Sequence, residues 1–338
     1  METQYASPVV RTALIGSGRY AQFLLRSILS DKSTSIRVIC EPSPATYEQA
    51  CAIFREQGVT PPPNQPDFDK LLADYAGQLD CAFILTPHAY HFAQATACLQ
   101  AGLDVLLQKP MVVNAQEAQG LIDVRDRTGK LLVVAFPGSL SPQIRTAVQM
   151  LRSGQLGSIL SITAVVYEEW RKFNTGTWRQ IPEIAGGGFF FDAGAHMLNT
   201  VCDLAGEDFQ QVAAWLDKRG LAVDIMGVVM GKLRSGALVT LNGCGETATS
   251  YASDLRVICT GGVLHANIWG TYLALQKPGE RTATPIEVPA SMGVWEQFLA
   301  VRRGAIANPC PAEVGLRMAR LWDAIQSSSA QDGAVVKL

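Results

Sequence analysis

The sequence predicts a two-domain α/β protein, in which a helix-flanked parallel sheet precedes an α+β domain with a largely antiparallel, open-faced sheet. Strand-like apolar runs alternate with helical patterns as far as residue 137, an order typical of a parallel sheet. From about residue 210 to residue 276, β-segments follow one another with only turn signals between them, which indicates antiparallel pairing. The 338 residues also exceed the usual size of one domain. We therefore expect domains at residues 1–137 and 138–338.

The first strand and the first helix enclose a glycine-rich turn. The strand, residues 9–15, ends at Gly16, and apolar residues at helical spacing begin at Phe23. Gly16 permits a tight turn, Gly18 lets the backbone approach a pyrophosphate, and Ala21 keeps the helix close to the sheet. The helix N-terminus would then face the phosphates. The cofactor-binding candidates in this turn are Gly16, Ser17, Gly18, Arg19 and Tyr20.

An acidic residue follows the second strand. This strand, residues 36–40, ends at Glu41, about where a carboxylate accepts hydrogen bonds from both ribose hydroxyls of a dinucleotide. Because Glu41 would repel a 2′-phosphate, NAD is favoured over NADP, while Arg19 and Arg37 keep NADP possible. The glycine turn and the acid together predict a dinucleotide site, with a purely structural turn or an S-adenosylmethionine pocket as the alternatives.

The rest of the first domain alternates between strands and helices. Residues 60–66 are expected to form a surface loop, because three consecutive prolines cannot continue a helix or a central strand. Helices are predicted at 68–75 and 114–128, and a strand at 131–136. The Pro-Gly pair at 137–138 marks the expected domain boundary.

Two further strands end in polar residues. The strand at 80–85 leads into a turn and a helix that reaches Gln100, and the strand at 104–107 leads into Lys109. Because ligands of open parallel sheets bind at the carboxyl ends of the strands, these residues should share one crevice with Gly16. The candidates for cofactor contact at these strand ends are Thr86, Pro87, His88, His91, Gln108 and Lys109.

The second half is predicted to begin with a helix at 141–152 and a strand at 159–167, ahead of the β-segments. Consecutive strands joined by short turns need no crossover helices, so one face of their sheet should be free. We expect that face to join copies of the chain into a homodimer or homotetramer. Closing helices are predicted at 294–303 and 312–326, and the last of them can pack back on the first domain.

Three glycines at 186–188 precede three polar residues at helical spacing. If this segment is helical, Asp192, His196 and Asn199 project from one face. A carboxylate one turn from an imidazole fixes the ring tautomer and stabilises its charged form, so the pair predicts proton transfer. The alternative is structural, with Asp192 as an N-cap that accepts from a backbone N–H near Ala195, and His196 as a hydrogen-bonded interior histidine.

The loop at 168–182 is rich in aromatic and charged residues. Trp178 and Arg179 are expected to reach over the cofactor or the substrate, with Glu168 as a further wall candidate. An aromatic ring can stack on the apolar face of a sugar, and arginine can bind a carboxylate or a phosphate. The alternative is that the tryptophans only anchor a long loop to the core. The residues expected to contact the substrate are Tyr167, Trp170 and Asn199.

The composition is that of an ordinary globular protein and argues against several kinds of partner. A net charge of −2 gives no reason to expect binding to nucleic acid or to an anionic membrane. Eight cysteines lie scattered in apolar stretches with no CxxC pair, so we expect buried thiols and no metal site. No apolar run reaches the ~18 residues that span a bilayer, and the N-terminus shows no leader pattern. These features predict a cytoplasmic protein.

The chain resembles the Gfo/Idh/MocA oxidoreductase family over nearly its whole length. The resemblance rests on the glycine turn at Gly16, Thr86-Pro87 followed by His91, Lys109-Pro110, and the GGGxxxDxGxH run that ends at His196. It implies hydride transfer between NAD or NADP and a hydroxyl-bearing carbon of a sugar, cyclitol or related polyol. It also implies a Rossmann domain followed by an open-faced sheet domain that commonly mediates dimers or tetramers.

By motif match, Lys109, Asp192 and His196 take the family's catalytic positions. The expected mechanism has His196 accept the hydroxyl proton, Asp192 hold the imidazole and Lys109 stabilise the developing alkoxide, with the alternative that Lys109 is the proton acceptor. Two residues depart from the family pattern: Gln108 stands where Glu is usual, and Asn199 where Asp is usual. Two other functions stay open, an NAD-dependent glycoside hydrolase that oxidises its sugar transiently and a cofactor-binding regulator without chemistry.

Overall fold

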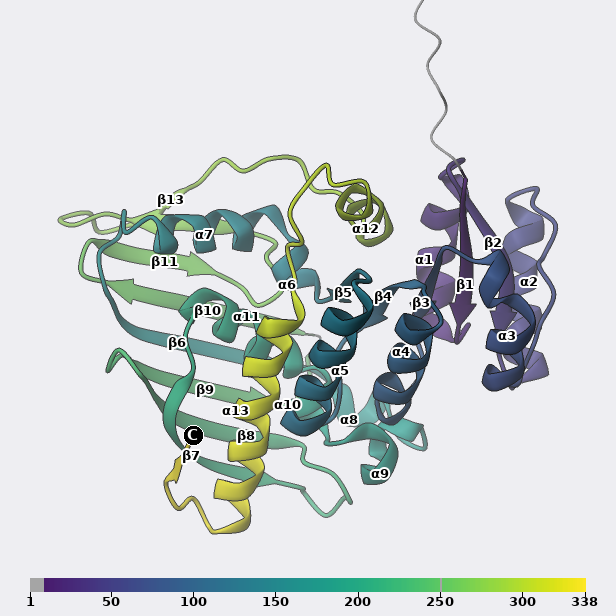
Figure 1. The fold of residues 1–338 in the computed structure, drawn as a ribbon. Coiled ribbons are helices and arrows are strands. Elements are labelled where there is room, and N and C mark those ends of the chain that lie inside the picture. The colour runs from purple at the N-terminus through teal and green to yellow at the C-terminus, as the bar shows by residue number, and fades with distance from the viewer. Residues whose placement is uncertain (1–8, 250) are drawn as a thin grey trace, which may run out of the picture.

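The protein contains two β-sheets, as a computed structural model that describes residues 9–249 and 251–338 shows (Figure 1). Five parallel strands form the first sheet, in the order β2-β1-β3-β4-β5, and nine strands form the second. The predicted succession of a parallel sheet and a largely antiparallel one is confirmed. The expectation about a leader concerns the first eight residues, which lie outside the described ranges.

The strands of the first sheet follow the predicted apolar runs. They are buried almost throughout, because helices cover both faces of a parallel sheet. Their bounds are β1 Val10–Ile15, β2 Thr34–Cys40, β3 Cys81–Ile84, β4 Asp104–Gln108 and β5 Leu132–Ala135.

Helices from both halves of the chain cover the first sheet. One face packs against α1 (Arg19–Ser30) and α2 (Pro44–Glu56), and α12 (Val294–Arg302) joins them through Trp295 and Phe298. The other face packs against α3 Phe68–Tyr75, α4 His91–Gln100 and α5 Ala115–Thr128. The first sheet is therefore completed by a helix from the C-terminal part of the chain, and a division at residue 137 stays a prediction.

The proline-rich loop contributes to the edge of the first sheet. The Ile39 N–H donates to the Pro63 carbonyl at 3.0 Å, and the Gln65 N–H donates to the Ile39 carbonyl at 2.8 Å, which makes an isolated parallel bridge at Asn64. The neighbouring prolines lack an N–H group, so the bridge cannot extend into a strand. With this rudimentary strand beside β2, the sheet has the strand order of a dinucleotide-binding Rossmann domain.

The second sheet is antiparallel except where β6 and β9 pair in parallel. Its strands are β6 Ile159–Tyr167, β7 Phe209–Asp217, β8 Met226–Leu233, β9 Leu238–Cys244, β10 Ala252–Cys259, β11 Gly262–Ala266, β12 Leu273–Gln276, β13 Thr284–Pro285 and β14 Val336–Lys337.

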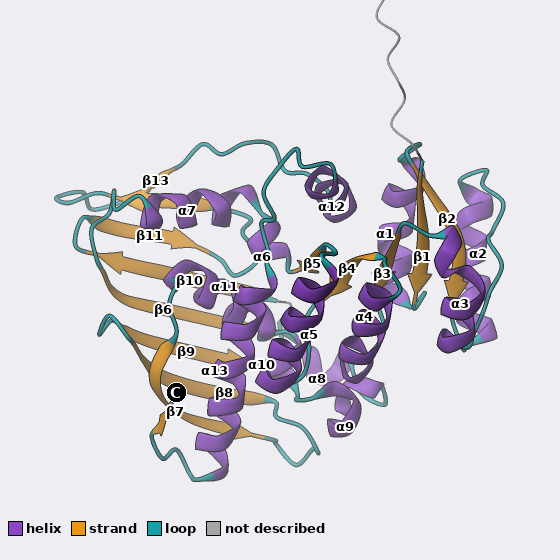
Figure 2. Ribbon diagram, viewed as in Figure 1, coloured by secondary structure: helices purple, strands orange, loops and turns teal. Residues whose placement is uncertain are grey.

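One face of the second sheet is covered by helices and the other is open (Figure 2). The covering helices are α7 (Pro142–Arg152), α11 (Ala195–Ala205) and α13 (Ala312–Ala330), and α13 also packs against α5 of the first half. Side chains alternate along the strands, so the open face exposes Trp215 and Met230.

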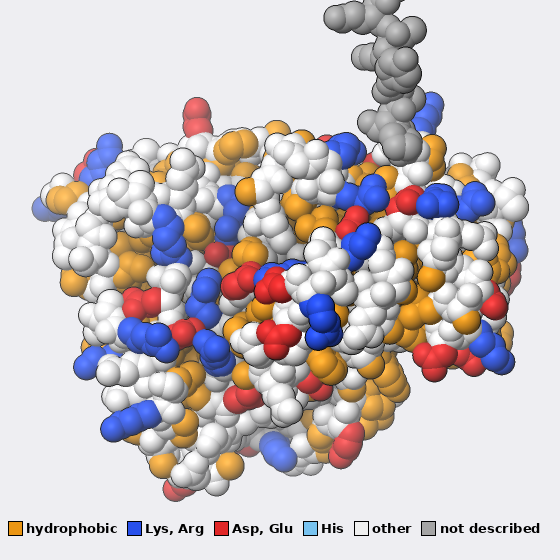
Figure 3. Space-filling view, viewed as in Figure 1, with side chains coloured by type: hydrophobic (Ala, Val, Ile, Leu, Met, Phe, Trp, Pro, Cys, Tyr) orange, Lys and Arg blue, Asp and Glu red, His pale blue; other side chains and the backbone are white. Residues whose placement is uncertain are grey.

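The surface carries both signs of charge. On the face seen in Figure 3, lysine and arginine are interspersed with aspartate and glutamate. Within the described ranges, no helix is long and apolar enough to cross a bilayer, and no cluster of His, Cys, Asp and Glu could hold a metal ion.

Candidate active site

One cavity of about 260 Å³ lies where the carboxyl ends of β3 and β4 meet the second half of the chain. Nine of the predicted residues line it: Tyr20, Thr86, His88, Gln108, Lys109, Trp178, Arg179, Asp192 and His196. Three lining residues were not predicted: Leu85, Pro137 and Trp269. Segments that are distant in the sequence therefore converge here, as the strand-end argument predicts.

The glycine turn beside the cavity fits a pyrophosphate. Gly16 has a φ of +86°, and a Cβ there would lie only 3.0 Å from the Leu85 carbonyl. At Gly18 a Cβ would meet no heavy atom within 4 Å, so the backbone is open on that side. The N-cap of α1 makes no side-chain hydrogen bond and the first turn has no acidic residue, which leaves its N–H groups and dipole for an anion. Arg19 is the first residue of this helix.

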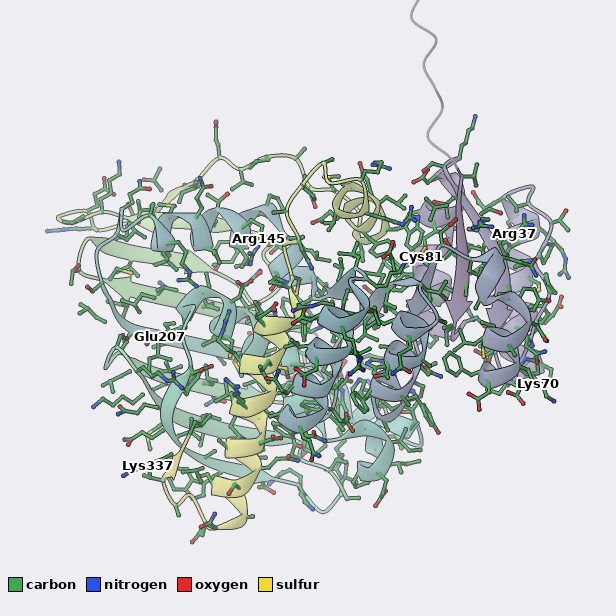
Figure 4. All side chains as sticks on the ribbon, viewed as in Figure 1. Arg37, Lys70, Cys81, Arg145, Glu207 and Lys337 are labelled. Carbon is green, nitrogen blue, oxygen red and sulfur yellow. The ribbon has the colours of Figure 1, made fainter. Side chains whose placement is uncertain are left out.

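Glu41 lies beside the glycine turn. One carboxylate oxygen accepts from the Ser17 N–H at 2.9 Å and from its hydroxyl at 3.2 Å, and the other accepts from the Ser43 N–H at 3.0 Å. These bonds fix the carboxylate at the position where ribose hydroxyls are bound in such domains. Arg37, labelled in Figure 4, lines a different cavity with Thr34 and Gln78, so it is not placed to bind a 2′-phosphate at this turn.

His91 ties two strand-end loops together. Its ring nitrogens lie 2.8 Å from the Pro110 carbonyl oxygen and 2.9 Å from the Thr86 carbonyl oxygen, and the residue is fully buried. It does not line the cavity, and its two ring nitrogens hold the loops after β3 and β4 together. Pro87 similarly serves as the N-cap of the short turn at 88–90.

Lys109 and Asp192 form an ion pair across the cavity. The Lys109 ammonium donates to a carboxylate oxygen of Asp192 at 2.9 Å and to its backbone carbonyl at 2.6 Å. The other carboxylate oxygen accepts from the Trp170 indole at 2.8 Å and lies 3.0 Å from Arg179 Nε. Burial alone would raise the pKa of the Asp192 carboxyl, but the charges of Lys109 and Arg179 outweigh it and hold that pKa well below its usual range. Lys109 thus has an acidic partner although Gln108 precedes it.

Asp224 fixes the backbone that presents Asp192. Its carboxylate accepts from the Gly188 N–H at 2.7 Å and from the Phe190 N–H at 2.8 Å, at the start of α10 (Phe189–Asp192). A Cβ on Gly188 would overlap the carbonyl oxygen of Asp224. The phenylalanines of α10 are fully buried. Gly188 is therefore required by the close approach of the Asp224 backbone.

The structure corrects the expected contact between Asp192 and His196. Helix α10 ends at Asp192, and α11 starts at Ala195 with Gly194 as an N-cap that makes no side-chain hydrogen bond, so the N-cap alternative for Asp192 is also wrong. Among the described residues, His196 Nδ1 is buried without a hydrogen-bond partner. Because Asp192 is already bonded to three other side chains, it orients Lys109 and not the imidazole.

Both cavity histidines are held neutral. Burial, reinforced by the positive charge of Lys109, lowers the pKa of His196 to about 3. Burial likewise lowers the pKa of His88 to about 3, although Asp192 opposes the shift. The Nδ1 of His88 lies 2.7 Å from the Ala185 carbonyl oxygen, and its ring packs edge-on against Trp178 at 4.8 Å between centroids.

The loop at 168–182 folds into short helical turns instead of an irregular loop. They are α8 Trp170–Phe173, a 3-10 turn Trp178–Gln180 and the start of α9 Pro182–Ala185. Trp178 both lines the cavity and supports the Arg179 guanidinium, which lies 4.5 Å from the centroid of the Trp178 ring. Trp178 therefore forms part of the cavity wall, while the other tryptophan of the loop, Trp170, is buried in the core.

None of the three predicted substrate contacts lines the cavity. Tyr167 pairs with Cys244 at the end of β6, on the open face of the second sheet. Trp170 is buried and bonded to Asp192. Asn199 is fully buried and donates to the Ser139 hydroxyl at 2.8 Å, in a network with Asp203 of α11 and Arg145 of α7. Arg145 is labelled in Figure 4. Glu168, which was expected as a further wall residue, does not line the cavity either. Helical spacing predicts that Asn199 shares a helix face with His196, but it cannot predict which residues of other elements Asn199 contacts.

Trp269 is the most prominent residue that sequence reasoning missed. It lies between β11 and β12 and brings an indole to the cavity beside His196. The available signal was a tryptophan next to Gly270, in the connection between two β-segments. Pro137 was interpreted only as a boundary residue.

The fold and the cavity define a dinucleotide-binding protein with a Rossmann domain. Residues 10–136 match the sequence model described as "Oxidoreductase family, NAD-binding Rossmann fold", and residues 144–265 match the one described as "GFO/IDH/MocA C-terminal domain". The chain belongs to the Gfo/Idh/MocA oxidoreductase family.

Several known proteins are similar to this chain. A 1-carboxy-3-chloro-3,4-dihydroxycyclohexa-1,5-diene dehydrogenase of Comamonas testosteroni is 24% identical over 245 residues, 72% of this chain but only 60% of that protein. A scyllo-inositol 2-dehydrogenase (NADP(+)) of Bacillus subtilis is 25% identical over 287 residues, 76% of this chain and 79% of that protein. The crystal structure of an inositol dehydrogenase homologue complexed with NAD+, from Azotobacter vinelandii, superposes with a TM-score of 0.82 at 18% identity, over 99% of this chain and 98% of that one. At that identity the superposition shows the fold alone.

Proposed function

We propose that this chain transfers a hydride between a nicotinamide cofactor and a hydroxyl-bearing carbon of a sugar, cyclitol or related polyol. One observation carries the proposal: Lys109 and His196, from opposite halves of the chain, line one cavity beside the dinucleotide turn. The relatives described above are named for cyclic hydroxyl compounds, which supports the substrate class. NAD is the proposed cofactor, because the Glu41 carboxylate is bonded to Ser17 of the glycine turn, where it would repel a 2′-phosphate.

The residues of the cavity divide the chemistry between them. The glycine turn at Gly16 and the carboxylate of Glu41 would hold a nicotinamide dinucleotide, which would supply the hydride acceptor. Lys109, fixed by Asp192, stabilises the negative charge that develops on the substrate oxygen. His196 is neutral at pH 7, so its imidazole can accept a hydrogen bond from the substrate hydroxyl. A pKa of about 3 makes it a weak base, so the proton that it takes as the hydride leaves passes on to water. Trp170 and Arg179 position the Asp192 carboxylate.

The open face of the second sheet supports a further proposal, that copies of the chain associate as a homodimer or homotetramer. Trp215 is 43% exposed, Met230 50% and Leu238 59%, all on strands whose opposite face is core. Such an apolar surface is typical of an interface. Because all eight cysteines are free thiols, we also propose a reducing compartment such as the cytoplasm.

The test is the absorbance of reduced nicotinamide while sugars, cyclitols and sugar acids are supplied with NAD and with NADP in parallel. We expect net NADH formation with at least one polyol, faster with NAD. A glycoside hydrolase would instead release product without net NADH. A regulator would bind NADH tightly and turn over none of the panel, and either result would overturn the proposed reaction.

A further inference from the structure

We propose that Trp269 selects ring-shaped substrates, by presenting an indole face to a contiguous set of C–H groups that an open-chain polyol does not hold together. The inference rests on the proposed function and narrows its substrate class. Trp269 lines the cavity with Lys109 and His196. It lies beyond residue 265, where the match to the C-terminal family model ends, so family membership by itself does not assign it a role.

The loop that carries Trp269, residues 267–272, is held by neighbours on several sides. Thr200 of α11 donates to the Ile268 carbonyl at 2.9 Å, the Ile268 N–H donates to Ser253 of β10 at 3.2 Å, and the Thr271 N–H donates to the Asn267 side chain at 3.0 Å. Thr200 follows His196 on the same helix, so the bond to Ile268 links the position of the indole to that of the imidazole.

The same loop packs tightly against residues 138–141, at the start of the second half of the chain. A Cβ on Gly138 would overlap the Ile268 carbonyl, and a Cβ on Gly270 would overlap the Ser141 side chain. Gly138 therefore lets the backbone approach the loop backbone, and Gly270 leaves room for the Ser141 side chain. Both contacts lie close in sequence to Pro137, which also lines the cavity. A contact group fixed in this way loses little conformational entropy when a ligand binds.

The indole of Trp269 packs partly against the core and partly lines the cavity. It is half-buried, and its aromatic neighbour Tyr251 meets it edge-to-face at 5.2 Å, an arrangement that does not stack over the whole ring. Among the described residues its N–H has no acceptor, as is also the case for Trp178 of the cavity and for Trp215 of the open sheet face. The other three indoles donate hydrogen bonds, those of Trp170, Trp295 and Trp322. Buried or half-buried indoles usually find a partner. A hydroxylated ring supplies an apolar C–H face and an oxygen together.

An open-chain polyol fits this surface less well. Its C–C bonds rotate freely, so a planar C–H face forms only at the cost of conformational entropy. Stacking on an aromatic ring contributes enough to change affinity about five- to tenfold beyond area burial. The indole would therefore favour cyclitols and pyranoses over linear alditols of the same size and polarity.

The experiment measures calorimetric binding to the NADH-loaded protein and initial rates with NAD. The ring compounds are myo-inositol, scyllo-inositol and D-xylose, and the open-chain compounds are sorbitol, ribitol and glycerol. Trp269→Leu keeps apolar volume without the aromatic face, and Trp269→Phe keeps a smaller face without the N–H. The matched control is Tyr272→Ala, because Tyr272 is an exposed aromatic of the same loop that does not line the cavity.

We expect the wild type to bind ring compounds more tightly than open-chain ones, and Trp269→Leu to lose about five- to tenfold of the ring affinity with NADH affinity unchanged. Trp269→Phe should fall between them, and Tyr272→Ala should match the wild type. An unchanged ring preference in Trp269→Leu, a loss of NADH affinity in that variant, or no ring binding by the wild type would overturn the inference. Ring binding that depends on Trp269 but leads to no turnover would instead refute the proposed reaction alone.

Discussion

Asp192 organises the charges of the cavity. One carboxylate oxygen is bonded to Lys109, and the other is shared by Trp170 and Arg179. The carboxylate stays ionised because these positive charges outweigh the effect of its burial on its pKa. Its role is therefore to hold the Lys109 ammonium at a fixed place, and the imidazole of His196 is positioned by α11.

Replacing Asp192 tests this role. Asp192→Asn keeps the shape and an acceptor for the Trp170 indole but removes the charge that fixes Lys109. We expect the turnover number to fall about 10²- to 10³-fold, within the range for a lost positioned acid–base group, with little change in NADH affinity. Steady-state rates and a fluorescence titration with NADH measure both. Asp254→Asn, which disrupts an ion pair with Arg256 on the open sheet face, is the control. A turnover number within threefold of the wild type would refute the positioning role.

The lowered pKa of His196 predicts acid sensitivity of the fold. The imidazole takes up a proton with an ordinary pKa near 6.5 in the unfolded chain and only near 3 in the folded one. As pH falls from 6.5 towards 3, the unfolded state binds more protons and the free energy of unfolding decreases.

Urea unfolding at pH 7.5 and pH 5 measures this effect. Between these values the wild type should lose about 2 kcal/mol more than His196→Gln, because the variant has no imidazole to protonate at that position. The comparison removes the contributions of groups that both proteins share. Equal losses in the two proteins would mean that His196 has an ordinary pKa when folded.

At the scale of elements, the segment from Gly186 to Ala205 shows what sequence periodicity could not resolve. Helical spacing places Asp192, His196 and Asn199 on one face if the segment is helical. The structure divides the segment into α10, which ends at Asp192, and α11, which starts at Ala195. The start of α10 is fixed by Asp224, which is 36 residues further along the chain and accepts from the N–H of Gly188. Periodicity reports which face a residue occupies but carries no information about such distant partners.

A substitution at Gly188 tests the close approach. Gly188→Ala would place a methyl group against the Asp224 carbonyl, so the backbone of α10 must shift. We expect the free energy of unfolding to fall by about 1–3 kcal/mol and the thermal midpoint to decrease accordingly. Gly77→Ala is the matched control, because a Cβ there would meet no heavy atom within 4 Å. Equal thermal midpoints for the two variants would contradict this account.

The strands of the first sheet could be predicted from the sequence because each is a short apolar run followed by glycine or polar residues. The rudimentary strand at Asn64, beside β2, could not be predicted, because the prolines around Asn64 disfavour any strand. The packing of α12 on the first sheet was equally invisible. Its buried Trp295 stacks on Phe83 at 5.9 Å, a contact between residues more than two hundred positions apart.

At the scale of the whole molecule, the sequence predicted those cavity residues that belong to short local motifs. Strand-end residues and the glycine run carry their own signals, and the structure brings Lys109, Asp192 and His196 together. The substrate side was not predictable, because its lining depends on how the second sheet is placed against the first. Trp269 comes from a turn of that sheet, whereas the expected Tyr167 faces away from the cavity.

Association through the open sheet face is also a property of the whole molecule. A double substitution, Met230→Asp with Leu238→Asp, places two buried charges in the proposed interface. We expect the variant to sediment as a monomer under conditions where the wild type is a dimer or tetramer. The control is Phe23→Asp, which changes an apolar residue that is 75% exposed on α1. An unchanged sedimentation coefficient in the double variant would place the interface elsewhere.

The most direct test of the account is a double-mutant cycle on turnover with Lys109→Met and His196→Ala. If both side chains act on one substrate oxygen, each single variant loses about 10²- to 10⁴-fold in turnover, and the double variant is little worse than the poorer single one. NADH affinity should persist in all three. Near-normal turnover in both single variants, or losses that multiply fully in the double variant, would show that these two residues do not serve the same chemical step.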